Sequence, residues 1–345
     1  MINEKMTSRE RVLTALKRAI PDRVPWIEGI VDDSLATRLT GEPIRLNWEI
    51  APDGTPVASG AELAEMQKKI CRVLAKDNIN WNAFAPIYAG KTHHKGVVVV
   101  GEGLIHSRDD LKMMRFPDID QPGFLDEARA FIAHKDDFCA VACIRLGIGA
   151  ALMSMGLQAF SYAMVDDPDF ISIILRKYAD WTIRLAPRLT EIGFDIFWAF
   201  DDVAFNSGPM FSPQFYRKTV LPIQKEVADA LPLPLITHSD GDMTPLLDDW
   251  LKLGQAAIHP VQPDVMDIYA IKALWGNQIC LVGNIFMDDL VHKSPDEITA
   301  EVRDRIEKIG KKGGYIISSS NSLTSDMKPE NIFAMRDAIQ KYGTY

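Results

Sequence analysis

The amino-acid sequence predicts an α/β protein built as a (β/α)8 TIM barrel, with an N-terminal helical extension and an inserted hairpin. The second half of the 345-residue chain alternates short apolar runs with helical stretches five times. This alternation implies parallel strands joined by right-handed crossovers. The first half holds three more apolar runs, and eight strands close a barrel of this class. No Gly-rich nucleotide motif follows any expected strand, which argues against an open doubly wound sheet.

The strands are expected wherever a short apolar run is bounded by polar or turn residues. They fall at 24–30, 79–84, 138–144, 196–200, 235–237, 256–258, 279–282 and 315–317. The inserted hairpin is expected at 97–105, where four valines precede two glycines. No change in composition resembles a linker, so residues 1–345 are expected to form one domain.

The helices are expected from local start and stop signals. Thr7 and Glu10 form a capping box for the N-terminal helix, and Ser294 and Glu297 form another near the end of the chain. Further helices are expected at 61–75, at 168–193, at 213–230 with a kink at Pro222, at 244–253, at 267–275 and over the apolar spacing that ends at Tyr342.

Composition limits the partners that the chain can have. It carries 47 acidic and 38 basic residues, a formal net charge of −9, which argues against nucleic acid as a main partner. No apolar run reaches the roughly 18 residues of a membrane span, and residues 1–11 lack the apolar core of a secretion signal. The four cysteines show no paired spacing, so they are expected to be reduced and buried. We expect a soluble, cytoplasmic protein, and a homodimer is compatible with the sequence.

Polar residues follow most of the expected strands, at the end of the barrel where active sites of this fold are assembled. The candidate site residues are Glu28, Asp201, Asp202, His238, Asp240, His259, Gln262, Asn284 and Asn321. Loops are polar in any protein, and Asp, Ser and Asn also make turns and caps, so part of this pattern has a structural explanation.

His238 is the strongest catalytic candidate. It ends a strand directly, and Asp240 lies two residues later, where it can orient the imidazole or share a metal ion with it. A core histidine bonded to a backbone carbonyl is the alternative. Asp201 and Asp202 can supply a general acid or stabilise a cationic intermediate, although one of them can equally hold the loop that follows.

The remaining candidates are expected to bind substrate. Glu28 follows the first strand, His259 and Gln262 the sixth, Asn284 the seventh, and Asn321 lies in the hydroxyl-rich loop after the eighth. Pro260 restricts the backbone at His259, so a structural role there is an equal alternative.

Several motifs together resemble the uroporphyrinogen decarboxylase superfamily. The resemblance spans nearly the whole chain. It rests on Thr7–Leu13, Pro21–Pro25, Asp166–Pro168, Phe200–Asp202, His238–Gly254, Gly283–Asn284, Gly313–Ile316 and Pro329–Asn331. It implies a (β/α)8 barrel with the site at the carboxyl ends of the strands. The true decarboxylases of this superfamily carry an Arg-Gln-Ala-Gly-Arg-Tyr motif after the first strand, whereas Trp26–Asp33 here is acidic, which would repel a polycarboxylated tetrapyrrole.

The other branch of the superfamily contains corrinoid-dependent methyltransferases. Members that use coenzyme M hold zinc with a His-x-Cys pair and a distant Cys, where this chain has His238, Asp240 and a position at or near Asn321. In character the chain is most similar to the methyltransferase components of O-demethylase systems. The resemblance implies transfer of a methyl group from a small, methoxylated aromatic donor to the cobalt of a separate corrinoid protein, with zinc held through His238 and Asp240.

Two alternatives stay open. One is a metal-free decarboxylase of an aromatic or pyrrolic acid, in which Asp201 or Asp202 stabilises a protonated ring. The other is a barrel that binds a ligand or partner without catalysis. The first is separated from methyl transfer by activity that survives chelation and needs no corrinoid.

Overall fold

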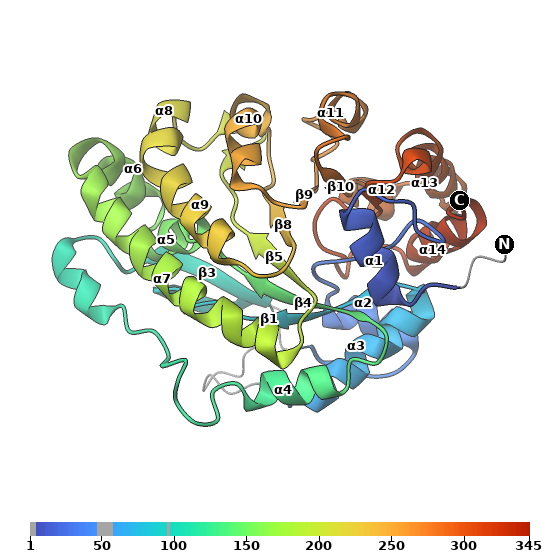
Figure 1. The fold of residues 1–345 in the computed structure, drawn as a ribbon, viewed down its shortest axis with the longest axis horizontal. Helices are drawn as coiled ribbons and strands as arrows, with labels where there is room; N and C mark the ends of the chain where they lie inside the picture. Colours follow the sequence, from blue (N-terminus) through green and yellow to red (C-terminus); the bar gives the residue numbers. More distant parts are fainter. Residues whose placement is uncertain (1–4, 47–57, 95–96) are drawn as a thin grey trace.

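A computed structural model describes residues 5–46, 58–94 and 97–345, and in this part seven strands form one parallel sheet (Figure 1). The strand order is β1 (Asn78–Asn82), β4 (Cys139–Ile144), β5 (Ile196–Phe200), β8 (Leu235–His238), β9 (Ala257–His259), β10 (Cys280–Val282) and β11 (Tyr315–Ile316). Every neighbouring pair in this order is parallel. The predicted class, α/β with a parallel barrel-like sheet, is confirmed at this level.

The first strand of the predicted barrel, at 24–30, is not formed as a regular strand. Residues 24–30 lie between β11 and β1, where Trp26 makes an isolated parallel bridge to Ile317 and its carbonyl accepts from the Asp77 N–H at 2.7 Å. Side-chain amides replace the rest of the ladder toward β1: Asn78 Oδ1 accepts from the Glu28 N–H at 3.0 Å, and Asn80 Nδ2 donates to the Glu28 carbonyl at 2.8 Å. The prediction of a strand at 24–30 is therefore wrong in its hydrogen bonding.

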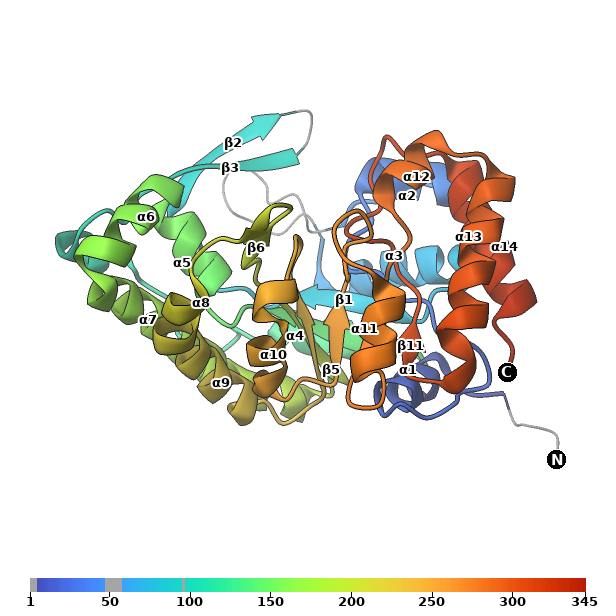
Figure 2. The same cartoon turned by 90° about the horizontal axis from the view of Figure 1, so that it is seen from above.

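Helices surround the sheet; most of them cover its outer face (Figures 1 and 2), whereas the N-terminal one packs Val12, Ala15 and Leu16 against the inner side chains of the strands. They are α1 (Ser8–Leu16), α2 (Asp33–Thr40), α3 (Gly60–Leu74), α4 (Asp126–Ala133), α5 (Ile148–Met155), α6 (Leu157–Asp166), α7 (Pro168–Ile192), α8 (Pro213–Phe215), α9 (Leu221–Ala230), α10 (Leu247–Trp250), α11 (Ile268–Trp275), α12 (Met287–His292), α13 (Pro295–Lys308) and α14 (Pro329–Tyr342). Both faces of the strands are buried, which explains their continuous apolar runs.

Helix boundaries follow the local signals closely. The Asp167 side chain accepts from the Phe170 N–H at the start of α7, and Gly193 ends it in the left-handed region. The two predicted capping boxes are present at α1 and α13. The irregularity expected at Pro222 is a π-helical turn over Tyr216–Val220, directly before α9.

The inserted hairpin pairs β2 (Ala89–His94) with β3 (Val97–Gly103), so the predicted range 97–105 is its second arm rather than the whole hairpin. The Leu104 and Ile105 N–H groups, which follow β3, both bond the carbonyl of Ser154 in α5 at 2.9 Å. Figure 2 shows the hairpin projecting from this side of the molecule. A second small hairpin, β6 (Ala204–Phe205) with β7 (Gly208–Pro209), follows β5.

In the described residues no single helix is long and apolar enough to cross a membrane. The α5–α6 pair meets that length and composition only when taken together, and it is bent by 106°.

Candidate functional site

Three candidate side chains converge at the carboxyl ends of β5 and β8. His238, the last residue of β8, has its Nε2 atom 3.4 Å from Asp202 Oδ1 and 3.6 Å from Asp240 Oδ1. The Asp240 N–H donates to Asp202 Oδ1 at 3.0 Å, which ties the two carboxylates into one cluster. His238 is buried, whereas the Asp202 and Asp240 side chains are 47% and 33% exposed, so the cluster opens toward solvent through its carboxylates.

A second histidine fixes the orientation of the first. His259, at the end of β9, has its Nδ1 atom 2.7 Å from His238 Nδ1 and its Nε2 atom 3.2 Å from the Ser319 carbonyl. A carbonyl only accepts, so we assign the proton to His259 Nε2. Burial, and then the neighbouring charge of His238, hold the pKa of His259 well below its usual value. His259 Nδ1 is therefore an acceptor, His238 Nδ1 donates to it, and His238 Nε2 is left facing the two carboxylates.

Carboxylate oxygens do not donate hydrogen bonds when ionised, so His238 Nε2 and the two acids need a cation or a proton between them. Burial raises the pKa of Asp240 and the Asp202 charge raises it further, while the charge of His238 lowers it. Asn321 Nδ2 donates to Asp240 Oδ2, which leaves Asp240 Oδ1 turned toward His238. The cluster thus provides a place for one positive charge.

The cluster has the dimensions of a metal site. One atom each of Asp202, His238 and Asp240 lies within 4.8 Å of the others. In a tetrahedral zinc site with bonds of about 2.0–2.1 Å, neighbouring ligand atoms are roughly 3.3 Å apart, close to the 3.4 and 3.6 Å separations from His238 Nε2. Three protein ligands leave one position open, as in catalytic zinc sites, and the His238 Nδ1–H bond to His259 is the outer-sphere contact that metal-ligating histidines make.

The sequence profile of the family described as uroporphyrinogen decarboxylase (URO-D) matches residues 146–342, more than half of the chain. The chain belongs to the uroporphyrinogen decarboxylase family. The matched range begins just after β4 and contains Asp201, Asp202, His238, Asp240 and Asn321.

The curated relatives of the chain include decarboxylases and a methyltransferase. The chain is 26% identical over 216 residues to a uroporphyrinogen decarboxylase of Pseudoalteromonas atlantica, covering 59% of this chain and 56% of the relative. It is 23% identical over 168 residues to a methylated-thiol–coenzyme M methyltransferase of Methanosarcina mazei, covering 49% and 44%. The chain thus spans about half the length of the curated relatives it matches.

Among solved structures, a methyltransferase from Methanosarcina mazei superimposes with a TM-score of 0.78 at 18% identity, over 98% of this chain and 99% of that one. A B12-independent methionine synthase from a Shewanella species gives 0.52 at 10% identity, over 92% and 98%. At these identities the likeness concerns the fold. It supports the barrel-like architecture of the uroporphyrinogen decarboxylase family.

Asp201 lies beside the cluster, but backbone N–H groups that follow β4 bind its carboxylate and hold it away from the mouth of the barrel. Its carboxylate accepts from the Gly149 N–H at 2.6 Å and from the Leu146 N–H, so it caps the entrance to α5. Burial raises the pKa of Asp201 to about 6, although Arg145 and the two N–H donors act in the other direction. Of the paired acids, Asp202 lies in the cluster and Asp201 positions the loop after β4.

Glu28 lies beneath the site with no exposed surface. Its carboxylate accepts from Trp26 Nε1 at 2.6 Å and from the Ser319 N–H and hydroxyl at 2.9 and 2.6 Å. The same residue, Ser319, accepts from His259, so Glu28 holds the loop that holds the histidine pair. Burial raises the pKa of Glu28 despite these bonds. Because the Glu28 carboxylate is buried and bound by Trp26 and Ser319, it is not placed to contact a substrate as the sequence predicted.

The other two expected binding residues lie apart from the cluster. Gln262 accepts from the Gly241 N–H at 2.7 Å and thereby holds the loop after Asp240. Asn284 is buried, donates to the Val261 carbonyl at 2.7 Å and accepts from Arg305 Nε at 2.9 Å. Asn284 therefore joins the β10 loop to α13 instead of facing the mouth. Asn321 does lie at the cluster, through Asp240.

Sequence reasoning missed Arg145, which follows β4 at the mouth. The sequence signal was present: Cys139, Val141 and Cys143 lie at every second position in the inner core of the sheet, and Arg145 continues that face.

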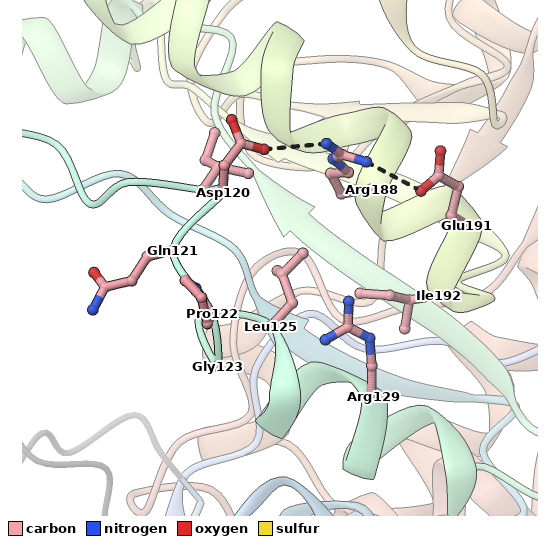
Figure 3. A pocket seen from close by; sticks show the side chains of 10 residues that line it. Asp120, Gln121, Pro122, Gly123, Leu125, Arg129, Arg188, Glu191 and Ile192 are labelled. Carbon is pink, nitrogen blue, oxygen red and sulfur yellow. Dashed lines mark hydrogen bonds and ion pairs between the residues drawn. The ribbon is translucent and has the colours of Figure 1, made fainter.

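A cavity of about 450 Å³ lies elsewhere, between α4, α7 and the loop before α4. Its arginines are already paired, as Arg188 is with Asp120 at 3.1 Å (Figure 3).

Proposed function

We propose that this chain is the methyltransferase component of a corrinoid-dependent system. It would pass a methyl group from a small methoxylated aromatic donor to the cobalt of a separate corrinoid protein. The observation that carries this proposal is the Asp202–His238–Asp240 cluster at the carboxyl ends of β5 and β8, with His238 Nε2 turned toward both carboxylates.

The chemistry needs help at the ether oxygen, because a phenolate is a poor leaving group. His238, Asp202 and Asp240 would hold Zn²⁺, which supplies Lewis acidity toward that oxygen when bound. Without a metal, the raised pKa of Asp240 lets its carboxyl hold a proton at the same place. His259 and Asn321 keep His238 and Asp240 oriented toward the donor.

Two of the relatives support methyl transfer. Both a methyltransferase structure and a coenzyme M methyltransferase sequence from Methanosarcina mazei match. The thiolate zinc set of that branch is replaced here by nitrogen and oxygen donors, and Asn321 contacts Asp240. Because soft thiolates are absent from this cluster, an oxygen-linked methyl donor suits it better than a thiol.

The acceptor is expected on another protein. No Asp-x-His-x-x-Gly corrinoid motif occurs in the printed sequence, so the corrinoid would dock at the open end of the barrel. The half-exposed side chain of Asp202 is compatible with such access.

The test compares the native chain with His238→Ala and with His134→Ala, a matched control for an exposed histidine. Bound zinc is measured by elemental analysis, and methylation of cob(I)alamin is followed with a panel of methoxylated aromatics. His238→Ala should lose the metal and at least about a hundredfold in methyl transfer, while the control retains both. Full activity in a folded His238→Ala protein would refute the assignment.

A metal-free decarboxylase is the second candidate. It is favoured by the names of several relatives and by the exposed Asp202 carboxylate, which can stabilise a protonated ring. Release of carbon dioxide from an aromatic acid after chelation, with no corrinoid present, would favour it over methyl transfer.

A further inference from the structure

Arg145 is a cation at the barrel mouth that the proposed chemistry does not use. It follows β4, and its Nη1 atom donates to the carbonyl of Phe200 at 2.7 Å on the neighbouring strand. Its guanidinium carbon lies 4.8 Å from the centre of the Phe84 ring. The guanidinium is therefore held at the level of the strand ends, beside the residues that precede Asp202.

The charge of Arg145 has no counter-ion in contact with it. Across the described residues it forms no ion pair, and its Nε atom is buried without a hydrogen-bond partner. Asp201, the acid whose charge acts most strongly on Arg145, accepts from the N–H groups of Leu146 and Gly149. Burial lowers the pKa of Arg145 even though the charges of Asp201 and Asp202 oppose this. A partly buried guanidinium with no anion in contact keeps part of its desolvation cost uncompensated, so an anionic ligand would stabilise it.

An aromatic wall connects this cation to the His238 cluster. The Phe84 and Phe200 rings meet edge to face at 6.3 Å, and the Phe200 ring lies 5.3 Å from that of His238. Phe200 and His238 are also direct partners in the β5–β8 register. Nearby at the end of β1, the side-chain oxygen of Asn82 is likewise buried without a partner. Polar groups that lack partners thus lie beside two partly exposed aromatic side chains, Phe84 and Phe200.

We propose that Arg145 binds an anionic group of the substrate, a carboxylate, and so selects anionic methyl donors over neutral ones. The ring of the donor would pack against Phe84 and Phe200, which places its far end at His238, Asp202 and Asp240. The forked donors of arginine match a carboxylate with two parallel hydrogen bonds, and Arg145 has guanidinium N–H groups beyond the Nη1 donor that Phe200 takes. This assignment names the substrate class of the proposed methyltransferase. It rests on the proposed function only for the reaction of the methoxy group, not for binding of the carboxylate.

The test measures binding separately from turnover, with 4-methoxybenzoate and its neutral analogue 4-methoxybenzamide as probes in isothermal titration of the full chain. The native protein should bind the carboxylate at least about tenfold more tightly than the amide, the scale of a charge-assisted hydrogen bond. Arg145→Gln should abolish the preference, and Arg145→Lys should retain part of it while keeping the charge. Arg188→Gln, an exposed arginine in the other cavity, should leave it unchanged.

The outcomes separate this inference from the proposed function. A preference for the carboxylate that disappears in Arg145→Gln supports it even if no methyl transfer occurs, and His238→Ala should keep that preference. Equal affinity of the native protein for both probes, no binding of either, or a preference that persists in Arg145→Gln would overturn it, whether or not methyl transfer is observed.

Discussion

At the scale of single residues, the pair of imidazoles at the ends of β8 and β9 is the most consequential contact. His259 Nδ1 lies 2.7 Å from His238 Nδ1, and the Ser319 carbonyl on its other side determines which nitrogen accepts. Neither histidine alone settles the tautomer of His238. The tautomer follows from His238, His259 and the Ser319 carbonyl together: the carbonyl can only accept, so a neutral His259 carries its proton on Nε2 and accepts at Nδ1 from His238.

Replacing His259 tests this chain of hydrogen bonds. His259→Phe keeps an aromatic ring at this position but removes the Nδ1 acceptor, so nothing holds the His238 proton on its Nδ1 atom. We expect zinc affinity to fall about 10- to 100-fold, the usual cost of losing such a contact, as measured by competition with a chelator. Nitrogen-15 NMR of the imidazoles should show His238 losing its fixed tautomer. His292→Phe, at an exposed histidine, should change neither quantity; an unchanged affinity in His259→Phe would contradict the assigned tautomer.

Asp201 makes a prediction about pH. Its folded pKa of about 6 lies above the ordinary value of 3.8, so the folded state holds the proton more tightly than the unfolded state. Ionising it therefore costs stability as pH rises from about 4 to 6. Asp201→Asn lacks this titration, so its stability relative to the native chain should rise across that window, by up to about 3 kcal/mol for a shift of about two pKa units. Urea unfolding of both proteins at several pH values measures the difference; a pH-independent difference would show that Asp201 titrates normally.

At the scale of elements, the segment 24–30 shows how the sheet can be completed without a regular strand. Asn80 Nδ2 donates to the carbonyls of Glu28 and Gly29, at 2.8 and 2.7 Å, and its Oδ1 accepts from Asn78 at 2.7 Å. These bonds replace a backbone ladder, and they fix the position of Glu28 and thus of the Ser319 loop.

Asn80→Ala should therefore destabilise the chain more than a typical polar substitution. It removes the donor to the buried Gly29 carbonyl and the Oδ1 acceptor of Asn78, while the Glu28 carbonyl keeps its bond from Asn78 at 3.0 Å, and we expect a cost of about 2–4 kcal/mol in the free energy of unfolding. Asn277→Ala, at an exposed turn, should stay within about 0.5 kcal/mol of the native value. If the two variants lose equal stability in urea unfolding, the side-chain amide of Asn80 does not stabilise the contact between the segment 24–30 and β1.

The same segment shows which elements sequence can predict. The boundaries of α7 and α13 follow from caps that lie within three residues of the helix start, so local chemistry determines them. The segment 24–30 is apolar enough for a strand, but its partners are amides about 50 residues away, which no local pattern contains. Helices α5 and α6 were missed because their apolar residues lack amphipathic spacing and capping signals.

Site residues divide in the same way. His238 and Asp240 were predictable because strand ends mark the mouth of a barrel, and the register between β5 and β8 brings Asp202 to them. The neutral partner His259 and the unpaired Arg145 were not assigned these roles, because each depends on contacts with residues more than 20 positions away. Spacing locates a side chain on a face, but its partners decide what it can do.

At the scale of the whole molecule, the two ends of the sheet carry different kinds of polar network. The amino ends hold Asp77, whose buried carboxylate accepts from Arg11 Nη1 at 2.6 Å, Arg23 Nη2 at 2.8 Å, Ser8 Oγ at 2.9 Å and the Trp26 N–H at 2.9 Å. Every oxygen there has partners. At the carboxyl ends, within the described residues, Asp202 and Asp240 lie beside His238 without a Lys or Arg partner, and Arg145 forms no ion pair; this is the division between stability and function expected of barrels.

This division predicts opposite outcomes for two buried or half-buried acids. Asp77→Ala removes the anion from between two arginines and should cost about 3–5 kcal/mol in the free energy of unfolding, while the folded fraction keeps its zinc affinity and its preference for carboxylate probes. Asp240→Asn should do the reverse: it should lose zinc binding while its unfolding midpoint changes little, because burial of an ionised Asp240 is itself unfavourable. Urea unfolding and chelator competition on both variants test the pair. Loss of zinc in folded Asp77→Ala would mean that the amino-end network controls the geometry of the mouth, and that stability and chemistry are coupled across the sheet.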